Sequence, residues 1–201
     1  MQQQNVPGLN LELAEPAPGP IGAVARNRLL PRAGISPGNA LIGVASSGLH
    51  TNGYSLARQV AQGLDLHDPV PGGDGTSIGE ALCAVHRSYL PVLDRVLADD
   101  LALALAHITG GGLLDNVPRV LPNGIGARID VDAWPRPALF EWLIGAADLD
   151  IEDAHRIFNC GIGMVVVVDA DRAPAVQAAI DEPTWVIGET VADPASRVTL
   201  A

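Results

Sequence analysis

A run of β-branched residues in the second half of the chain constrains the fold more than any other feature. The stretch "GIGMVVVVD", residues 161–169, contains four consecutive valines. A short, continuous apolar run of this kind is typical of a strand that lies entirely inside a hydrophobic core. The sequence therefore predicts a sheet that other elements cover.

Apolar runs expected to be strands alternate with segments of helical spacing, and no internal repeat is present. The expected strands are 40–46, 101–108, 124–132, 161–169, 184–191 and 197–200. The expected helices are 54–63 ending at Gly63, 77–100 with Ser77 as N-cap and a break or kink at Pro91, 136–147, 150–158 and 172–181. Residues 21–30 fit an edge strand or a short helix, and 64–77 a surface loop. This order predicts an α+β fold with α/β-type layers, in which helices pack on a mixed β-sheet.

The composition indicates a globular protein. Of the 201 residues, 48% are hydrophobic and 17% charged, unlike the composition of disordered chains. Residues 1–20 are rich in Gln, Pro and Gly and are expected to be an irregular segment, followed by one domain over 21–201. No targeting sequence and no run of about 18 apolar residues is present, and the only cysteines, Cys83 and Cys160, lie far apart. We therefore expect a cytoplasmic protein with unpaired thiols that does not bind a membrane.

The charge balance excludes nucleic acid as a partner. Twelve Lys and Arg against 23 Asp and Glu give a formal net charge of −11, and the sequence has no basic stripe. A small anionic substrate remains compatible with this charge, because remote surface charges are screened beyond about 8 Å and local donors decide binding.

Three consecutive glycines follow an expected strand and precede a helix-like stretch in "HITGGGLLDN", residues 107–116. Glycine lets the backbone approach an anion closely, and a helix start adds free N–H groups, so Thr109, Gly110, Gly111 and Gly112 are candidates for phosphate binding. The alternative is a tight turn that packs the helix against its strand. His107, at the strand end, is either a hydrogen-bonded structural residue or a group that contacts substrate and transfers protons.

Two further stretches place polar groups beside expected strands. "SSGLHTNGYSL" contains Ser46, Ser47, Gly48, His50, Thr51 and Asn52 in a loop between a strand and a helix, where local capping would account for one or two of them. "FNCGIGMVVVV" places Asn159 before the buried strand, where a simple turn is the alternative.

The sequence predicts neither a metal site nor a hydrolase. The cysteines and histidines lack the spacing of metal ligands, and Ser47 does not lie in a GxSxG motif. Asp115 and Asn116 fit residues that complement the dipole of a helix's first turn or cap it, and the alternative is that they face a ligand or metal.

Taken together and in order, "ALIGVASSGLHTNGYSLARQV", "AHITGGGLLDNVPRVLPNGIGARID", "HRIFNCGIGMVVVV" and "WVIGE" resemble the C-terminal half of the phosphoribosylformylglycinamidine cyclo-ligases, also called aminoimidazole ribonucleotide synthetases. The resemblance runs from about Ile21 to the end of the chain. It implies the mixed-sheet fold of that C-terminal domain.

The resemblance also implies a function, which is formation of a C–N bond in de novo purine biosynthesis. ATP activates the amide oxygen of formylglycinamidine ribonucleotide, an internal nitrogen attacks, and the ring of aminoimidazole ribonucleotide closes. His50, Asn52 and His107 would face the reacting part of the substrate. The loop residues Ser46, Ser47, Gly48, Thr51, Thr109, Gly110, Gly111, Gly112 and Asn159 would bind the substrate and its phosphate.

The resemblance further implies ATP and Mg²⁺ as cofactors, a small phosphoribosyl substrate, and a homodimer or a separate chain carrying the ATP-binding half. The N-terminal half of the family has no counterpart in this sequence, so ATP and Mg²⁺ are expected to bind mainly through that half and the chain alone to be inactive. The alternative is a non-catalytic module that binds a phosphoribosyl ligand or assembles with an ATP-binding chain. A third reading is another enzyme of the superfamily, such as a relative of selenophosphate synthetase or thiamine monophosphate kinase.

Overall fold

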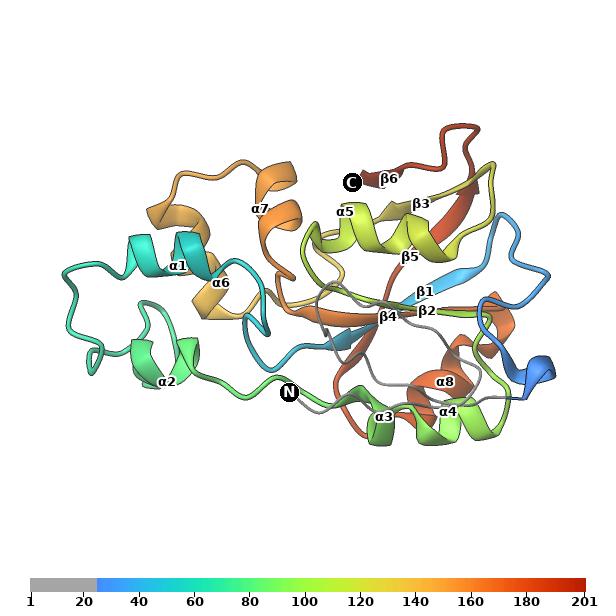
Figure 1. Cartoon of the computed structure of the whole chain (residues 1–201), viewed down its shortest axis with the longest axis horizontal. Coiled ribbons are helices and arrows are strands. Elements are labelled where there is room, and N and C mark those ends of the chain that lie inside the picture. The colour runs from blue at the N-terminus through green and yellow to red at the C-terminus, as the bar shows by residue number, and fades with distance from the viewer. Residues whose placement is uncertain (1–24) are drawn as a thin grey trace, which may run out of the picture.

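The computed structural model describes residues 25–201 and shows a sheet with helices on both faces (Figure 1). The strands in this range have the order β2-β4-β1-β5-β3-β6. Their bounds are β1 (Ala40–Ala45), β2 (Ala104–His107), β3 (Ile125–Ile129), β4 (Ile162–Val168), β5 (Thr184–Ala192) and β6 (Val198–Leu200). Four of the pairings are antiparallel, and β3 pairs with β6 in parallel. The predicted mixed sheet is confirmed.

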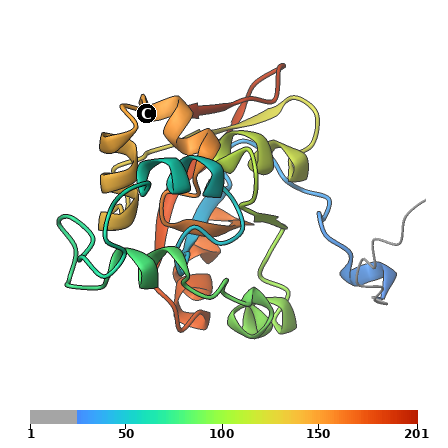
Figure 2. The ribbon, with the colours of Figure 1, turned by 60° about the vertical axis from the view of Figure 1, so that its left-hand side comes forward.

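The helices fall into three groups by position. The α-helices are α1 (Tyr54–Val60), α2 (Ile78–Leu82), α3 (Tyr89–Val92), α4 (Asp94–Ala98), α5 (Gly112–Asn116), α6 (Ala138–Ala146), α7 (Ile151–Ile157) and α8 (Ala173–Ala179), with short 3₁₀ segments at Arg26–Arg28, Val117–Val120 and Ala170–Arg172. Figures 1 and 2 show α5 on one face of the sheet and α3, α4 and α8 on the other. Helices α1, α2, α6 and α7 gather at one end. No helix in the described part of the chain has the length and apolar character needed to cross a membrane.

Strand β4 lies at the centre of the core, as its valine run predicts. Every residue of the strand is buried. Val165 and Val167 pack in the cluster that contains Leu113 of α5, whereas Val166 packs with Val176 of α8 on the opposite face. Burial of a side chain of this size contributes about 1.5–3 kcal/mol relative to exposure, so both helical layers are anchored on this strand.

The segment 77–100 differs most from its prediction. The expected N-cap at Ser77 is present as a capping box with Glu80, but the helix ends at Leu82 and an irregular linker, residues 83–88, precedes α3. The break expected at Pro91 lies instead at Leu93, between α3 and α4, because Pro91 is in the first turn of α3, where a missing N–H does no harm. The linker instead hydrogen-bonds to the loop after β1: the Ser47 hydroxyl donates to the Val85 carbonyl at 2.7 Å and accepts from the Arg87 N–H at 3.1 Å.

The other predicted elements are present with shorter bounds, except β5, which extends one residue beyond the predicted 184–191. Strand β2 begins at Ala104 rather than 101, and α1 ends at Val60, three residues before Gly63. The loop 64–77 contains only a single bridge, between Pro69 and Ser77. Within 21–30, the described part forms the short 3₁₀ helix Arg26–Arg28, which agrees with the short-helix alternative. Residues 1–24, which include the segment 1–20 expected to be irregular, lie outside the described range.

Backbone conformation and close contacts explain two of the three consecutive glycines: a Cβ on Gly111 would lie 2.5 Å from the Asp115 side chain of α5 itself, and Gly112 packs against α7. Gly111 and Gly112 have φ angles of +92° and +58°, a conformation that L side chains rarely adopt. A Cβ on Gly112 would lie 1.8 Å from the carbonyl oxygen of His155 in α7. The tight-turn alternative therefore holds for these two positions. The φ angle of Gly110 lies outside the left-handed region, and the residue is exposed. Neither backbone conformation nor packing therefore requires a glycine at position 110.

We expect Gly112→Ala to lower the free energy of unfolding by about 3 kcal/mol or more, since the left-handed backbone costs roughly 1–2 kcal/mol and overlap with α7 adds to it. Gly124→Ala is the matched control, because Gly124 has φ +84° and open space around its Cβ position. Urea denaturation compares the two variants. Equal losses of unfolding free energy in the two variants would show that the contact between α5 and α7 does not require a glycine at position 112.

The buried His155 predicts a pH dependence of stability. Its Nδ1–H donates to the Ile151 carbonyl at 2.8 Å, and burial, followed by the nearby Arg136, lowers its pKa below the usual 6.5. The unfolded chain therefore takes up a proton as the pH falls through about 6.5 while the folded chain does not, so stability is present above that pH and lost below it. His155→Leu should reduce the loss of unfolding free energy that occurs when the pH is lowered from about 7.5 to about 5. Urea denaturation at both pH values measures this change, with the exposed His67→Leu as control; an unaltered slope in His155→Leu would contradict the assignment.

Candidate functional site

The sheet topology brings the three polar stretches to one edge. Strands β1 and β2 both pair antiparallel with β4, so they run in the same direction on either side of it. Ala45 at the end of β1 pairs with Ile162, and His107 at the end of β2 pairs with Met164. The loop after β1, the loop after β2 and the turn before β4 therefore meet at the same place.

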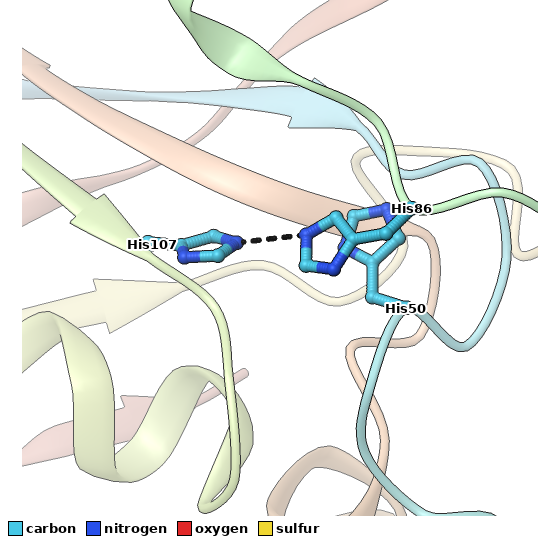
Figure 3. Close-up of side chains that lie close together, drawn as sticks. All are labelled: His50, His86 and His107. Carbon is cyan, nitrogen blue, oxygen red and sulfur yellow. Dashed lines mark hydrogen bonds between the residues drawn. The ribbon is translucent and has the colours of Figure 1, made fainter. Parts of the chain in front are cut away.

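Three histidines lie together at this edge (Figure 3). His50 comes from the loop after β1, His86 from the linker between α2 and α3, and His107 from the end of β2. The rings of His50 and His86 stack with their centroids 4.0 Å apart, and Nε2 of His86 lies 3.2 Å from Nε2 of His107. One ring nitrogen of each histidine lies within 4.8 Å of the others.

The surroundings keep two of these imidazoles neutral at physiological pH. Burial, followed by the neighbouring His86, His107 and Arg87, lowers the pKa of His50 to about 4. Burial and then His86 also lower the pKa of His107. A neutral imidazole offers a lone pair, which can accept a proton or a hydrogen bond, or bind a metal ion.

Ser46, Gly48 and Asn159 form a structural clamp. The Asn159 side chain accepts hydrogen bonds from the Ser46 hydroxyl at 3.0 Å and the Gly161 N–H at 2.9 Å, and donates to the Gly48 carbonyl at 2.8 Å. These bonds fix the loop after β1 to the turn that precedes β4. The Ser46 hydroxyl, the Gly48 carbonyl and the Asn159 amide all have hydrogen-bond partners within the protein, so these groups position the loop.

Asn52 and Gly110 bring the two main loops into contact. A Cβ placed on Gly110 would lie 3.4 Å from Oδ1 of Asn52. Asn52 is half-buried, whereas Gly110 and Thr51 are exposed. The two predicted loops are therefore neighbours in space, with an amide side chain and a bare backbone facing solvent where they meet.

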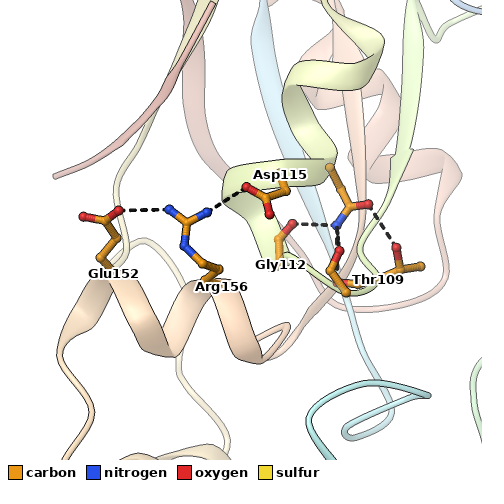
Figure 4. Close-up of polar contacts among 7 residues, drawn as sticks. Thr109, Gly112, Asp115, Glu152 and Arg156 are labelled. Carbon is orange, nitrogen blue, oxygen red and sulfur yellow. Dashed lines mark hydrogen bonds and ion pairs between the residues drawn. The ribbon is translucent and has the colours of Figure 1, made fainter.

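Asn116 fixes the shape of the glycine loop, of which Thr109 and Gly112 are labelled in Figure 4. Its Nδ2 donates to the carbonyls of Thr109, Gly110 and Gly112, and its Oδ1 accepts from the Thr109 hydroxyl at 3.0 Å. The predicted role of Asn116 in the first turn of a helix is wrong, because Asn116 is the last residue of α5 and its side chain instead binds the carbonyls of the glycine loop. Next to it, Arg156 of α7 bridges Asp115 and Glu152, and this ion-pair chain ties α5 to α7 on the outer surface.

A cavity of about 710 Å³ lies beside the loop after β1 but does not include the glycine loop in its lining. Ser46, Ser47 and Gly48 form one wall, and Asp74 and Glu80 contribute carboxylates to another. Acidic walls disfavour an anionic ester, so this cavity is a poor phosphate site. The junction of Gly110 and Asn52 lies outside it.

Among residues 25–201, the histidine trio is the one group of three or more His, Cys, Asp or Glu side chains close enough to surround an ion. Mg²⁺ prefers oxygen ligands and binds through carboxylates and phosphates. The histidine trio, which offers only nitrogen ligands, therefore does not fit Mg²⁺.

Sequence reasoning identified His50 and His107 but missed His86. No local pattern marks His86, because it joins the others only through the irregular linker, which hydrogen-bonds to Ser47. In the sequence, His86 lies within a segment of helical spacing and so looks like an ordinary helix residue. Only the path of the linker in the structure shows that His86 lies beside His50 and His107.

The sequence matches known proteins over most of its length. The family described as "AIR synthase related protein, C-terminal domain" matches residues 36–201. Over 179 residues, the chain is 46% identical to a protein of Sorangium cellulosum (strain So ce56) named phosphoribosylformylglycinamidine cyclo-ligase. This covers 85% of the chain and 51% of that relative, so the chain spans about half the relative's length.

Solved structures share the fold at lower identity. The thiamine-monophosphate kinase from Stenotrophomonas maltophilia K279a has a TM-score of 0.55 at 19% identity, covering 88% of this chain and 54% of that one. A T. maritima PurL complexed with FGAR has a TM-score of 0.55 at 15% identity, covering 88% of this chain and 27% of that one. With the family match over residues 36–201, these findings show that the chain belongs to the AIR synthase related proteins, as a member of their C-terminal domain family.

Proposed function

We propose that this chain provides the substrate-binding half of an ATP-dependent cyclo-ligase that closes formylglycinamidine ribonucleotide to aminoimidazole ribonucleotide. The observation that carries the proposal is the contact between the loop of His50 and Asn52 and the loop of Gly110, in a chain 46% identical to a named cyclo-ligase. The PurL neighbour is described with FGAR bound, and this supports a phosphoribosyl ligand as the substrate class.

The proposal assigns separate tasks to the site residues. The exposed backbone of Gly110 and the Asn52 amide provide donors for an anionic oxygen, and Thr51 and Thr109 border them. The exposed, neutral His107 is placed to accept the proton that a nitrogen loses on ring closure. His50 lies farther inside the protein, stacked on His86. Ser46, Ser47, Gly48, Asn159, Gly111 and Gly112 position these groups.

ATP would supply the phosphoryl group that turns the amide oxygen into a leaving group. Among the described residues, no three carboxylates lie close enough together to surround an ion, and we propose that ATP and Mg²⁺ bind mainly through the half of the relatives that this chain does not span. That half would come from a homodimeric full-length protein or from a separate chain.

Isothermal titration calorimetry tests the binding proposal. The chain should bind formylglycinamidine ribonucleotide, and removal of the 5′-phosphate should weaken binding about 10- to 100-fold, because hydrogen bonds to a charged group contribute about 1.5–3 kcal/mol. Asn52→Ala should weaken binding about tenfold. Asn123→Ala, on an exposed turn away from the site, is the control and should bind normally. Equal affinity for the phosphorylated and dephosphorylated forms would refute phosphate recognition.

A turnover assay tests the division between the two halves. With ATP, Mg²⁺ and substrate, the chain alone should produce no aminoimidazole ribonucleotide, and adding the N-terminal half of the Sorangium relative should allow turnover. Steady product formation by the chain alone would contradict the proposed division. Ligand binding without turnover in the combined sample would favour a non-catalytic phosphoribosyl-binding module.

A further inference from the structure

The histidine trio has the spacing of a transition-metal site. Zn²⁺ takes imidazole nitrogens at about 2.0–2.1 Å in tetrahedral geometry, which separates two such ligands by about 3.3–3.4 Å. Nε2 of His86 and Nε2 of His107 lie 3.2 Å apart and share a hydrogen bond (Figure 3). One ligand nitrogen of each of the three rings lies within 4.8 Å of the other two, so rotation of the rings out of this hydrogen bond would bring the nitrogens onto one ion.

His50 adds a second, independent observation. Its side chain is 4% exposed, and its Nδ1 is buried without a hydrogen-bond partner. Its Nε2 accepts the Ser47 N–H at 3.1 Å, so the ring proton is on Nδ1. If Nδ1 binds an ion, that proton moves to Nε2 and the contact with Ser47 is released as the ring turns out of its stack on His86.

The charges around the trio allow a cation. The charge of Arg87 reaches His50, and Arg87 is paired with Glu182. The Tyr89 hydroxyl, which packs beside the trio, donates to the Ala45 carbonyl at 2.8 Å. Imidazole ligands suit Zn²⁺, Ni²⁺ and Cu²⁺ and do not suit Mg²⁺ or Ca²⁺.

We propose that His50, His86 and His107 bind one divalent transition-metal ion of the zinc type, with further positions open to water or to an oxygen of a ligand. Three protein ligands with an open position is the arrangement of metal sites that exchange ligands, in contrast to closed structural sites. Because the ion occupies His50 and His107, metal binding and the proposed proton transfer by free imidazoles exclude each other in the same molecule.

Calorimetry with ZnCl₂ on the chelator-treated full chain, in the absence of any nucleotide or substrate, tests the site. We expect saturable uptake of one Zn²⁺ per chain and no comparable uptake of Mg²⁺. Changing residues that only orient a metal ligand commonly costs 10- to 100-fold in affinity, so His86→Asn should weaken Zn²⁺ binding at least about tenfold. His67→Asn is the control, since His67 is an exposed histidine outside the trio.

Cobalt substitution provides a second readout. Co²⁺ bound to the trio should give visible absorption bands of a low-coordinate site, and these should vanish in His86→Asn and persist in His67→Asn. If His86→Asn fails to fold by circular dichroism, His107→Asn replaces it, because His107 is exposed at the end of β2. Absence of saturable Zn²⁺ uptake, or the same uptake by the trio variants as by His67→Asn, would overturn the proposal. Neither result bears on phosphoribosyl binding, which is measured without the metal.

Discussion

The pairing of β4 with β1 on one side and β2 on the other is the constraint on which the rest of the molecule depends. Because both neighbours run antiparallel to β4, their carboxyl ends leave the sheet at the edge where β4 begins. The alternating side chains of β4 anchor α5 on one face and α8 on the other. A slip of one residue in this register would exchange the two faces and separate the loops.

The site inherits its rigidity from this arrangement. Asn159 holds the loop after β1, Asn116 holds the loop after β2, and Gly112 allows α7 to close against α5. The polar groups that remain open, at Asn52, Gly110 and His107, are those whose side chains or backbone are not consumed by these contacts. Functional groups on loops that a rigid scaffold positions are the usual arrangement for binding and catalysis.

The sequence was sufficient for the fold because its signals are local or compositional. The valine run predicts a buried strand, and the glycine and serine motifs mark the ends of two others. The sequence did not predict the irregular linker 83–88, because its residues have helical spacing while its backbone hydrogen-bonds to Ser47 instead of forming a helix. For the same reason the sequence could not place His86. Nor could it distinguish Gly110 from Gly112, since only the approach of His155 shows which glycine is required by packing.

The central claim is that a phosphoribosyl ligand binds where the loop of Asn52 meets the loop of Gly110. Amide chemical-shift mapping of the ¹⁵N-labelled chain during titration with formylglycinamidine ribonucleotide tests it most directly. The account predicts that the amides of residues 50–53 and 109–111 shift together along one binding curve. Shifts confined to the cavity walls around Asp74 and Glu80, with both loops unchanged, would contradict it.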